Sequence, residues 1–184
     1  MIRFTTSKTD NDFYEIIALQ KENLSKNLSE SELKSQGFVT VIHELEDLQK
    51  MDTHEHNLVA KEDDKIVGYI LAMTQQSKAD IPVLVPMFNN FEQIIYKGKI
   101  IAEHNFIVVG QVCIQKDYRG KGLFDEVYNA YKKQFFNKYD FAITSIATTN
   151  QRSINAHKRV GFVELHSFTD PDNTEWSIVA WDWK

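Results

Sequence analysis

The stretch that decides the fold is Phe106-Ile-Val-Val-Gly-Gln-Val-Cys-Ile-Gln-Lys-Asp-Tyr-Arg-Gly-Lys-Gly-Leu123. Residues 106–114 form a nearly continuous apolar run, which predicts a strand buried on both faces. From Leu123 onward, apolar side chains recur at the spacing of one helix face as far as about residue 139. Residues 141–147 predict another strand, so the three elements predict a βαβ unit with parallel strands and a right-handed crossover.

Between this strand and its helix lies the turn Arg119-Gly-Lys-Gly-Leu123. A glycine turn that opens a helix leaves backbone N–H groups without partners at the positive end of the helix dipole, which suits a phosphate. Glycine lets the backbone approach the phosphate closely, and Arg119 and Lys121 add positive charge. The alternative is a surface turn whose glycines serve geometry alone. The turn matches neither the P-loop nor the complete dinucleotide fingerprint, because Asp125 stands at the third glycine position of the latter.

The rest of the chain predicts elements that flank this unit on both sides. Helical spacing and capping patterns predict helices from residues 10–12 to Leu24, after Ser29, and from Asn150 to Gly161. Residues 75–104 have no clean period and predict a long connection with one helical turn, either a functional loop or a disordered one. The remaining strands are predicted at residues 2–5, 58–60, 66–72, 162–168 and 176–183.

Composition places the chain among ordinary globular proteins. Its 21 Lys+Arg and 26 Asp+Glu give a net charge of −5, which argues against a nucleic-acid or anionic-membrane surface. We expect one domain over residues 1–184, because no linker or repeat interrupts the chain. The single cysteine, Cys113, cannot pair within the chain, and no apolar run reaches the ~20 residues of a membrane span, so we expect a cytoplasmic protein.

The strand and turn together resemble the acetyl-CoA motif of the GNAT superfamily of N-acetyltransferases. That motif reads Q/R-x-x-G-x-G/A; Arg119 and Gly122 stand at its first and fourth positions, and Phe124 takes the sixth. A second block, Asn150-Gln-Arg-Ser-Ile-Asn-Ala-His-Lys-Arg-Val-Gly-Phe162, looks like the family's N-x-x-S-x-x-x-H-x-x-x-G-F segment. The spacing of its Asn, Ser and His puts them on one face of the predicted helix. The resemblance covers nearly the whole chain.

The resemblance implies a GNAT-like α/β (α+β) fold. Its centre would be a mixed, mostly antiparallel, twisted sheet of about seven strands, with one parallel βαβ unit and helices on both faces. In this family the two parallel strands splay apart, and the pantetheine arm of acetyl-CoA lies in the opening. Backbone groups of residues 112–114 would pair with the pantetheine, and N–H groups of residues 120–124 would hold the pyrophosphate. The implied cofactor-binding residues are Val112, Cys113, Ile114, Arg119, Gly120, Lys121, Gly122, Leu123, Phe124, Asn150 and Ser153, with no metal ion.

The resemblance also implies the reaction: acetyl-CoA is the co-substrate, and a neutral amine attacks its thioester directly. A backbone N–H of the 112–114 strand would stabilise the oxyanion. His157 stands where many family members have the tyrosine that protonates the leaving thiolate, and we expect it to be the general acid. The alternative is that this histidine only orients or packs, and water is the donor. For the base, Glu103, His104 and a chain of waters stay open, because Gln111 cannot take a proton.

Other residues have simpler explanations. His54-Glu-His56 holds two metal-ligand types without a third at a recognisable spacing, which predicts a solvated loop. His43-Glu44 lacks the second histidine of the H-E-x-x-H motif. Cys113, on a buried strand, is read as a small core residue near the thioester. Phe88 and Phe91 either line the acceptor pocket or anchor the long connection.

The leading hypothesis is an enzyme that moves an acetyl group from acetyl-CoA to a primary amine of a small molecule, an amino acid or a peptide. The 75–104 connection would then shape the acceptor site. A first alternative is a non-catalytic module of the same fold that binds or senses acyl-CoA. A second is an acidic protein-interaction domain that does not bind CoA. Nucleic acids and membranes are not expected as partners, and the resemblance allows a homodimer through the final strands.

Overall fold

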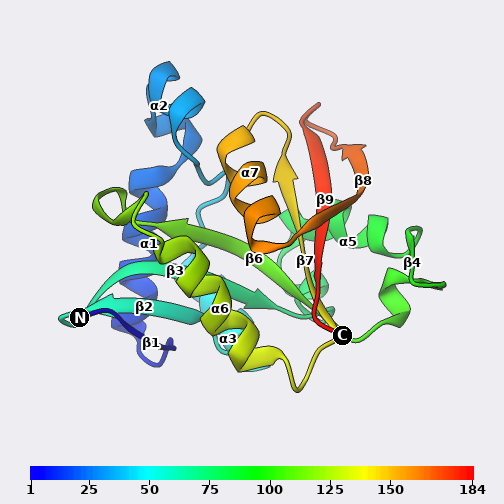
Figure 1. Ribbon diagram of the computed structural model, residues 1–184, viewed down its shortest axis with the longest axis horizontal. Helices are drawn as coiled ribbons and strands as arrows, with labels where there is room; N and C mark the ends of the chain where they lie inside the picture. Colours follow the sequence, from blue (N-terminus) through cyan, green and yellow to red (C-terminus); the bar gives the residue numbers. More distant parts are fainter.

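The computed structural model describes the backbone of residues 1–184 and the side chains of residues 1–82 and 84–184. Seven strands form one sheet in the order β1-β2-β3-β6-β7-β9-β8 (Figure 1). Neighbouring strands are antiparallel except β6 and β7, which are parallel, as the sequence predicts. The strands of this sheet are β1 (Arg3–Thr6), β2 (Leu58–Glu62), β3 (Lys65–Met73), β6 (Phe106–Ile114), β7 (Phe141–Ala147), β8 (Val163–Thr169) and β9 (Glu175–Asp182).

Helices cover both faces of the sheet (Figure 1). One apolar cluster joins the sheet to α1, α3 and α5 through side chains such as Phe13, Leu48 and Phe88, and we call this side the α1 face. A second cluster joins the sheet to α6 and α7 through side chains such as Tyr131 and Ile154, and we call this side the α6 face. The α-helices are α1 (Asp10–Asn23), α2 (Glu30–Ser35), α3 (Leu45–His54), α4 (Ser77–Asp80), α5 (Val85–Phe91), α6 (Leu123–Phe135) and α7 (Gln151–Val160).

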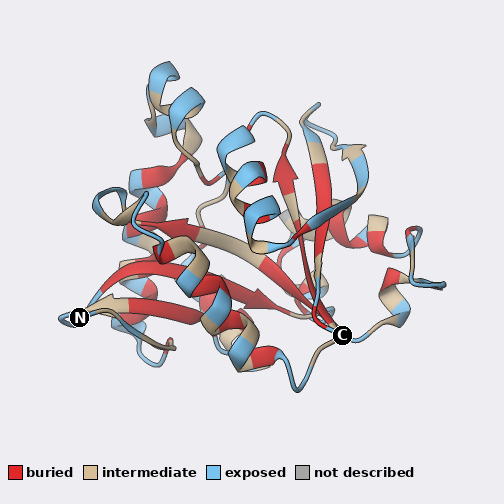
Figure 2. Ribbon diagram, viewed as in Figure 1, coloured by how far each residue is buried: buried red, intermediate tan, exposed pale blue. Residues whose placement is uncertain are grey.

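The central strands are buried on both sides, which explains why β6 reads as an apolar run (Figure 2). Along β6 the side chains alternate between the two apolar clusters. Phe106 and Val108 belong to the α1 face, and Ile107 and Val109 to the α6 face. Complete burial of an aliphatic side chain of this size contributes about 1.5–3 kcal/mol, so β6 holds the two helical layers together.

Local signals set the ends of three helices where the sequence predicts them. Thr9 and Ser29 each form a capping box at the start of α1 and α2. The Asn150 side chain caps α7 by accepting a hydrogen bond from the N–H of Ser153. Gly161 ends α7 in the left-handed conformation, with φ of 119°, which glycine adopts without a steric penalty.

The sequence does not predict α3, and this helix corrects the interpretation of residues 54–56 as a solvated loop at His54; Glu55 and the exposed His56 follow the helix. The apolar side chains of α3 are few, and a glutamate, Glu44, takes the position before its first turn. The helix forms because Leu48 and Met51 are completely buried in the α1-face cluster. His54 is therefore the last residue of a helix, where its Nε2 atom lies 2.9 Å from a carboxylate oxygen of Asp80.

The connection 75–104 is more ordered than the sequence predicts. The Phe91 ring on α5 meets the Phe106 ring edge-on at a centroid distance of 5.5 Å, and Phe88 is buried beside it. These contacts anchor the connection to β6, so the second explanation offered for the two phenylalanines is the one that holds. Besides α4 and α5, the connection contains the short strands β4 (Ile95–Tyr96) and β5 (Lys99–Ile100) and 3-10 turns at Pro82–Leu84 and Ile101–Glu103.

Candidate active site

The site begins where the parallel strands separate. β6 and β7 pair only from Phe106 opposite Phe141 to Val108 opposite Ile143, and then diverge (Figure 1). At the point of divergence the Thr144 hydroxyl donates a hydrogen bond of 2.7 Å to the carbonyl of Val109. On its other edge β6 carries a bulge at residue 110, because its register against β3 shifts there. The bulge and the early end of pairing leave one edge of β6 without a strand partner.

The bulge depends on a glycine. A Cβ atom built on Gly110 would lie only 2.2 Å from the Sδ atom of Met73, which is completely buried on the neighbouring strand. No side chain fits there without moving the core. Packing against Met73 therefore specifies a glycine at the position where the register of β6 shifts.

Two cavities open onto the separated strands. The turn cavity, of about 640 Å³, is bounded by the glycine turn, the start of α7 and the α2 end. The apolar cavity, of about 310 Å³, is bounded by the segment 38–43, residues 82–87 and the β8–β9 turn. Both cavities are lined by Phe38, Val39, Val112 and Ser153. The two spaces therefore adjoin each other at the unpaired edge of β6 and the inner face of α7.

The glycine turn has the geometry of an anion site. Gly120 and Gly122 have φ values of 72° and 88°, in the left-handed region that favours glycine, and α6 begins at Leu123. Within the described structure, no backbone or side-chain acceptor takes a hydrogen bond from the N–H groups of residues 120–124. The Leu123 side chain is buried in the core, so only its backbone can serve a ligand. Lys121 is exposed, with Nζ 5.9 Å from the Tyr118 ring centroid.

Arg119 lines the turn cavity, but its guanidinium is tied to the protein. Its Nε atom donates to the carbonyl of Ile114 at 2.9 Å, and its terminal nitrogens donate to the side-chain oxygens of Asn23 and Gln36. These partners are neutral, so the cation keeps its charge uncompensated beside the cavity. The side chain fixes the turn against α1 and β6; a contact to a cofactor phosphate stays a prediction.

Of the three β6 residues predicted to bind the cofactor through their backbone, two direct their N–H and C=O groups toward the opening. The N–H of Gln115 pairs with the carbonyl of Val67 on β3, and alternate residues of an antiparallel strand direct their N–H and C=O groups to opposite edges. Val112 and Ile114 therefore turn their backbone groups toward the opening, whereas those of Cys113 face β3. This corrects the expectation that the Cys113 backbone is free for a cofactor. Burial raises the pKa of its thiol to about 12, so the thiol is inert at neutral pH.

One of the backbone groups that face the opening, the carbonyl of Ile114, already accepts a hydrogen bond from Nε of Arg119. The N–H and C=O of Val112 and the N–H of Ile114 remain free to bind a ligand. Val112 lines both cavities, which makes it the backbone position closest to the junction between them.

The two predicted residues of the α7 start, Asn150 and Ser153, differ in whether they contact the protein or the cavities. Asn150 is 5% exposed; its Oδ1 atom caps α7, and its Nδ2 atom donates to the carbonyl of Phe38 at 3.0 Å. Its amide therefore joins α7 to the segment 38–43 and has little capacity left for a ligand. Ser153 lines both cavities, and its Oγ atom lies 3.3 Å from Nδ1 of His157.

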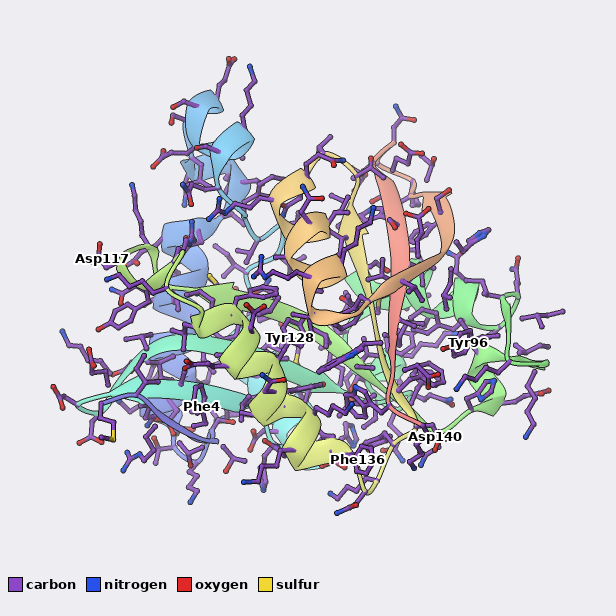
Figure 3. The ribbon with its side chains drawn as sticks, in the orientation of Figure 1. Phe4, Tyr96, Asp117, Tyr128, Phe136 and Asp140 are labelled. Atoms are coloured by element: carbon purple, nitrogen blue, oxygen red, sulfur yellow. The ribbon has the colours of Figure 1, made fainter. Side chains whose placement is uncertain are left out.

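His157 is held at both ring nitrogens. Its Nδ1 atom lies 2.8 Å from the carbonyl oxygen of Ser153, which can only accept, so Nδ1 carries the hydrogen. Its Nε2 atom therefore accepts from the hydroxyl of Tyr128, 2.6 Å away. Tyr128 lies on α6 and is labelled in Figure 3. Burial lowers the pKa of His157 to about 4. At neutral pH the ring carries no extra proton for a thiolate, so its surroundings do not support the expected acid role and favour the orienting alternative.

Phe124 fills the space at the sixth motif position. Its ring lies 5.0 Å from the Tyr128 ring centroid and meets the His157 ring at 5.3 Å. The side chain thus packs between α6 and α7 beside the turn cavity, where the family motif has a small residue. Its backbone N–H stays free at the start of α6.

The segment 38–43 belongs to the site, although the sequence shows no motif there. The Gln111 side chain on β6 donates to the carbonyl of Val41 at 2.9 Å, so the segment is tied to both walls of the opening. His43 lines the apolar cavity and is 2% exposed. Its backbone N–H donates to Oε1 of Gln20 at 2.9 Å, and its Nδ1 atom lies 3.1 Å from Nε2 of the same side chain. That His43 belongs to the site can be recognised only from its contact with Gln20 on α1 in the folded structure.

The two side chains offered as the base do not reach the site. Glu103 and His104 precede β6 at the end opposite Val112, which at the rise of a strand is more than about 20 Å away, and neither lines a cavity. His104 is bound there through Nε2 to the carbonyl of Tyr96. Of the three open choices, the chain of waters remains. In the described part of the chain, no group of three or more His, Cys, Asp or Glu side chains could hold a metal ion.

The parallel pair that splays, the glycine turn with free N–H groups and the two adjoining cavities lie together at one place on the sheet. A model of the acetyltransferase (GNAT) family matches residues 14–162, and the chain belongs to this family. No curated protein sequence matches the chain. Among its described helices, none is both long and apolar enough to cross a membrane.

Solved structures share the fold. Arabidopsis thaliana NAA60 in complex with acetyl-CoA superposes with a TM-score of 0.67 at 13% identity over 99% of each chain. A chimera of spermidine N-acetyltransferase SpeG from Vibrio cholerae and hSSAT gives 0.61 at 15% identity, over 99% of this chain and 95% of that one. The NatC complex bound to Gag peptide and CoA gives 0.61 at 12% identity, over 100% and 99%. At such identities these likenesses concern the fold alone.

Proposed function

We propose that this protein transfers an acetyl group from acetyl-CoA to a primary amine in a ternary complex. The observation that carries the proposal is the row of free N–H groups at residues 120–124, which opens on the turn cavity next to the unpaired edge of β6. A row of unpaired N–H groups at the N-terminus of a helix binds phosphate oxygens. The adjoining apolar cavity would take the amine.

The residues present fit acetyl-CoA as a co-substrate. The N–H groups of residues 120–124 would hold the pyrophosphate, with the Arg119 and Lys121 side chains adding positive charge. The backbone of Val112 and the N–H of Ile114 would pair with the pantetheine, because both face the opening. Acetyl-CoA supplies a thioester that carries the acetyl group.

The chain would then contribute positioning and polarisation. The N–H of Val112, at the junction of the two cavities, would stabilise negative charge on the thioester oxygen. The neutral His157 holds the first turns of α7 through Ser153 and would orient the Ser153 hydroxyl toward the junction. Water would take the proton of the amine and return one to the thiolate, because the side chains that line both cavities (Phe38, Val39, Val112 and Ser153) include no acid or base.

The first test is a thermal-shift titration with acetyl-CoA and with CoA. At a ligand concentration of one hundred times Kd we expect a stabilisation of about 2.7 kcal/mol, or a rise in Tm of about 5–10 °C. Gly122→Glu should abolish the rise, because its carboxylate would repel the pyrophosphate. Gly98→Glu is a matched control: Gly98 also has a positive φ, of 82°, with no described heavy atom within 4 Å of an added Cβ, but lies in the β4–β5 turn.

Release of thiol from acetyl-CoA across a panel of amines then separates enzyme from binder. A Tm rise with no thiol release for any amine would support the alternative, a module that binds or senses acyl-CoA. No Tm rise in the wild type would remove the acetyl-CoA proposal altogether. The proposal also includes one domain over residues 1–184, supported by the seven-stranded sheet, which contains strands from both ends of the chain. It further includes a cytoplasmic location, supported by the lone buried cysteine.

A further inference from the structure

His43 lines the apolar cavity and carries a buried ring nitrogen that has no hydrogen-bond partner in the described structure. The residue lies at the end of the segment 38–43, two residues before the start of α3, and is 2% exposed. It is not part of either sequence motif. Its Nε2 atom is one of four buried side-chain polar atoms without a hydrogen-bond partner in the described structure.

Gln20 determines what the His43 ring can do. The Oε1 atom of Gln20 accepts the backbone N–H of His43, so the Nε2 atom of this amide is left to donate to the ring Nδ1. Burial lowers the pKa of His43 to about 4, so the ring is neutral at physiological pH. A neutral imidazole whose Nδ1 accepts must carry its hydrogen on Nε2. The ring therefore offers an N–H donor on the side away from Gln20, and no free lone pair for a base.

The charged side chains that line the cavity determine whether a charged or a neutral ligand oxygen can bind the His43 donor. Asp170 and Asp172 are the charged side chains among the described residues that line the apolar cavity, and no lysine or arginine lines it. Hydrogen bonds from the Trp176 indole and from backbone N–H groups lower the pKa of Asp170, so it is ionised. These carboxylates attract an ammonium group and repel a carboxylate. The oxygen that fits the His43 donor is therefore a neutral one.

The other residues of the cavity walls indicate which further chemical groups a ligand would have. Apolar side chains from three separate segments surround the cavity, among them Phe38, Leu84, Met87, Phe168 and Trp176. On β7, Ser145 also lines this cavity, and its buried Oγ atom has no partner in the described structure. A hydroxyl can accept an N–H as well as donate, so Ser145 can serve the N–H of an amide whose carbonyl binds His43. An apolar amine without an oxygen would leave both groups unpaired.

We propose that the apolar cavity takes an amine that lies next to a neutral amide carbonyl and an apolar side chain, as in an aminoacyl amide or a peptide, and that His43 Nε2–H donates a hydrogen bond to that carbonyl oxygen. This proposal rests on the proposed acetyltransferase function and names its acceptor class. His43 is then a specificity-determining residue. It discriminates against aliphatic polyamines, which have no carbonyl, and Asp170 and Asp172 discriminate against free amino acids.

Three probes of matched shape test the acceptor class: leucinamide, leucine and 3-methylbutylamine, which share an isobutyl group and differ in the carbonyl. We measure kcat/KM for each amine from thiol release at saturating acetyl-CoA. The wild type should prefer leucinamide to leucine by at least about tenfold. His43→Phe should lower the ratio of leucinamide to 3-methylbutylamine by about tenfold, the loss of one hydrogen bond. Using the ratio cancels the difference in basicity between the two amines.

Two further variants keep the test decisive. His43→Gln places an amide N–H where the ring N–H lies and should recover part of the lost preference, which a purely structural histidine would not do. His56→Phe, an exposed histidine beyond α3, is the control for the substitution itself and should leave the ratio within twofold of wild type. An unchanged ratio in His43→Phe, or equal use of leucine and leucinamide by the wild type, would overturn the proposal.

Binding measurements decide the proposal if no thiol is released. In that event the proposed acetyl transfer fails, and calorimetric titration of leucinamide into the CoA complex takes the place of the kinetics. Binding that is weakened about tenfold by His43→Phe, and that 3-methylbutylamine does not match, would support the acceptor class alone. No binding of leucinamide, or equal affinity in the variant, would overturn it.

Discussion

Two buried histidines lie on opposite faces of the sheet, beside the same opening between β6 and β7. His157 belongs to α7 on the α6 face, and His43 contacts α1 on the α1 face. Each ring is 2% exposed, and burial lowers the pKa of each to about 4. They differ in their partners: both nitrogens of His157 are bound, whereas Nε2 of His43 has no partner in the described structure.

This difference separates a residue that holds the protein together from one that can hold a ligand. A ring bound at both nitrogens already has its preferred partners, and a ligand would have to replace one of them. A ring bound at one nitrogen keeps its orientation and still has an unsatisfied donor, whose pairing a ligand can supply. Burial and a shifted pKa are shared by both histidines, so neither property alone identifies the functional one.

The largest expected effect is on stability. His157→Phe leaves the Tyr128 hydroxyl buried without a partner and should lower the free energy of unfolding by about 3 kcal/mol, measured by urea denaturation at pH 8. His43→Phe leaves the Nε2 atom of the buried Gln20 without its ring partner, but it also removes a donor that has no partner, so it should cost less, about 2 kcal/mol. Adding Tyr128→Phe to His157→Phe should recover part of the loss, because it removes the orphaned hydroxyl. Equal losses in the two single variants would contradict the distinction.

A second, smaller effect is shared by both histidines and concerns pH. In the unfolded chain a histidine takes up a proton near pH 6.5, whereas each buried ring does so only near pH 4. The contribution of each ring to stability is therefore complete above pH 6.5 and is lost as the pH falls toward 4. Between pH 8 and pH 5 each histidine should account for about 2 kcal/mol of lost stability.

The check on this pH effect is the difference between variants. Urea midpoints measured at pH 8 and pH 5 should shift less in His43→Phe and in His157→Phe than in the wild type, by similar amounts. A wild-type dependence that survives both substitutions would assign the effect to carboxylates instead.

A third prediction concerns catalysis at His157. Since the ring is neutral and bound at both nitrogens, a folded His157→Phe enzyme should lose less than tenfold in kcat, with the affinity for CoA kept. The profile of kcat between pH 6 and pH 9 should keep its shape. A loss of more than tenfold, together with the disappearance of a limb that falls with rising pH, would restore the acid role that the family resemblance implies.

The smallest expected effect concerns two neighbouring residues of β7, one with a paired and one with an unpaired buried hydroxyl. The Thr144 hydroxyl donates to the carbonyl of Val109, whereas the Ser145 hydroxyl has no partner in the described chain. Thr144→Val should therefore cost about 1 kcal/mol in stability, and Ser145→Ala should change it by no more than about 0.5 kcal/mol. Thermal unfolding without ligand measures both; a larger loss for Ser145→Ala would mean that its hydroxyl has a structural partner.

The sequence predicts the central unit well because its signals are local. The apolar run 106–114, the glycine turn and the helix from Leu123 each lie within a few residues of their own determinants. The caps at Asn150 and Gly161 likewise place the ends of α7 correctly. The row of free N–H groups follows directly from a helix that begins at a glycine turn, so this half of the site could be predicted.

The other half could not be predicted, because its determinants are far apart in the sequence. α3 forms through burial of Leu48 and Met51 against the α1 face, not through a strong pattern of its own. His43 becomes part of a site only because Gln20, on α1, binds its ring. The role expected for His157 depends on the Tyr128 hydroxyl, which lies on another helix and occupies the nitrogen that a ligand would need.

The sequence by itself determined the family, the strand–turn–helix unit and the place of the glycine turn with its free N–H groups, because backbone geometry at glycines and helix ends is set by neighbouring residues. The tertiary structure alone decided which polar groups are still free to bind. Hydrogen-bond partners such as Gln20 and His43, or Tyr128 and His157, are separated by 23 and 29 residues along the chain, and only folding brings them together. Whether a buried group binds a ligand depends on that pairing, and so could be seen only in three dimensions.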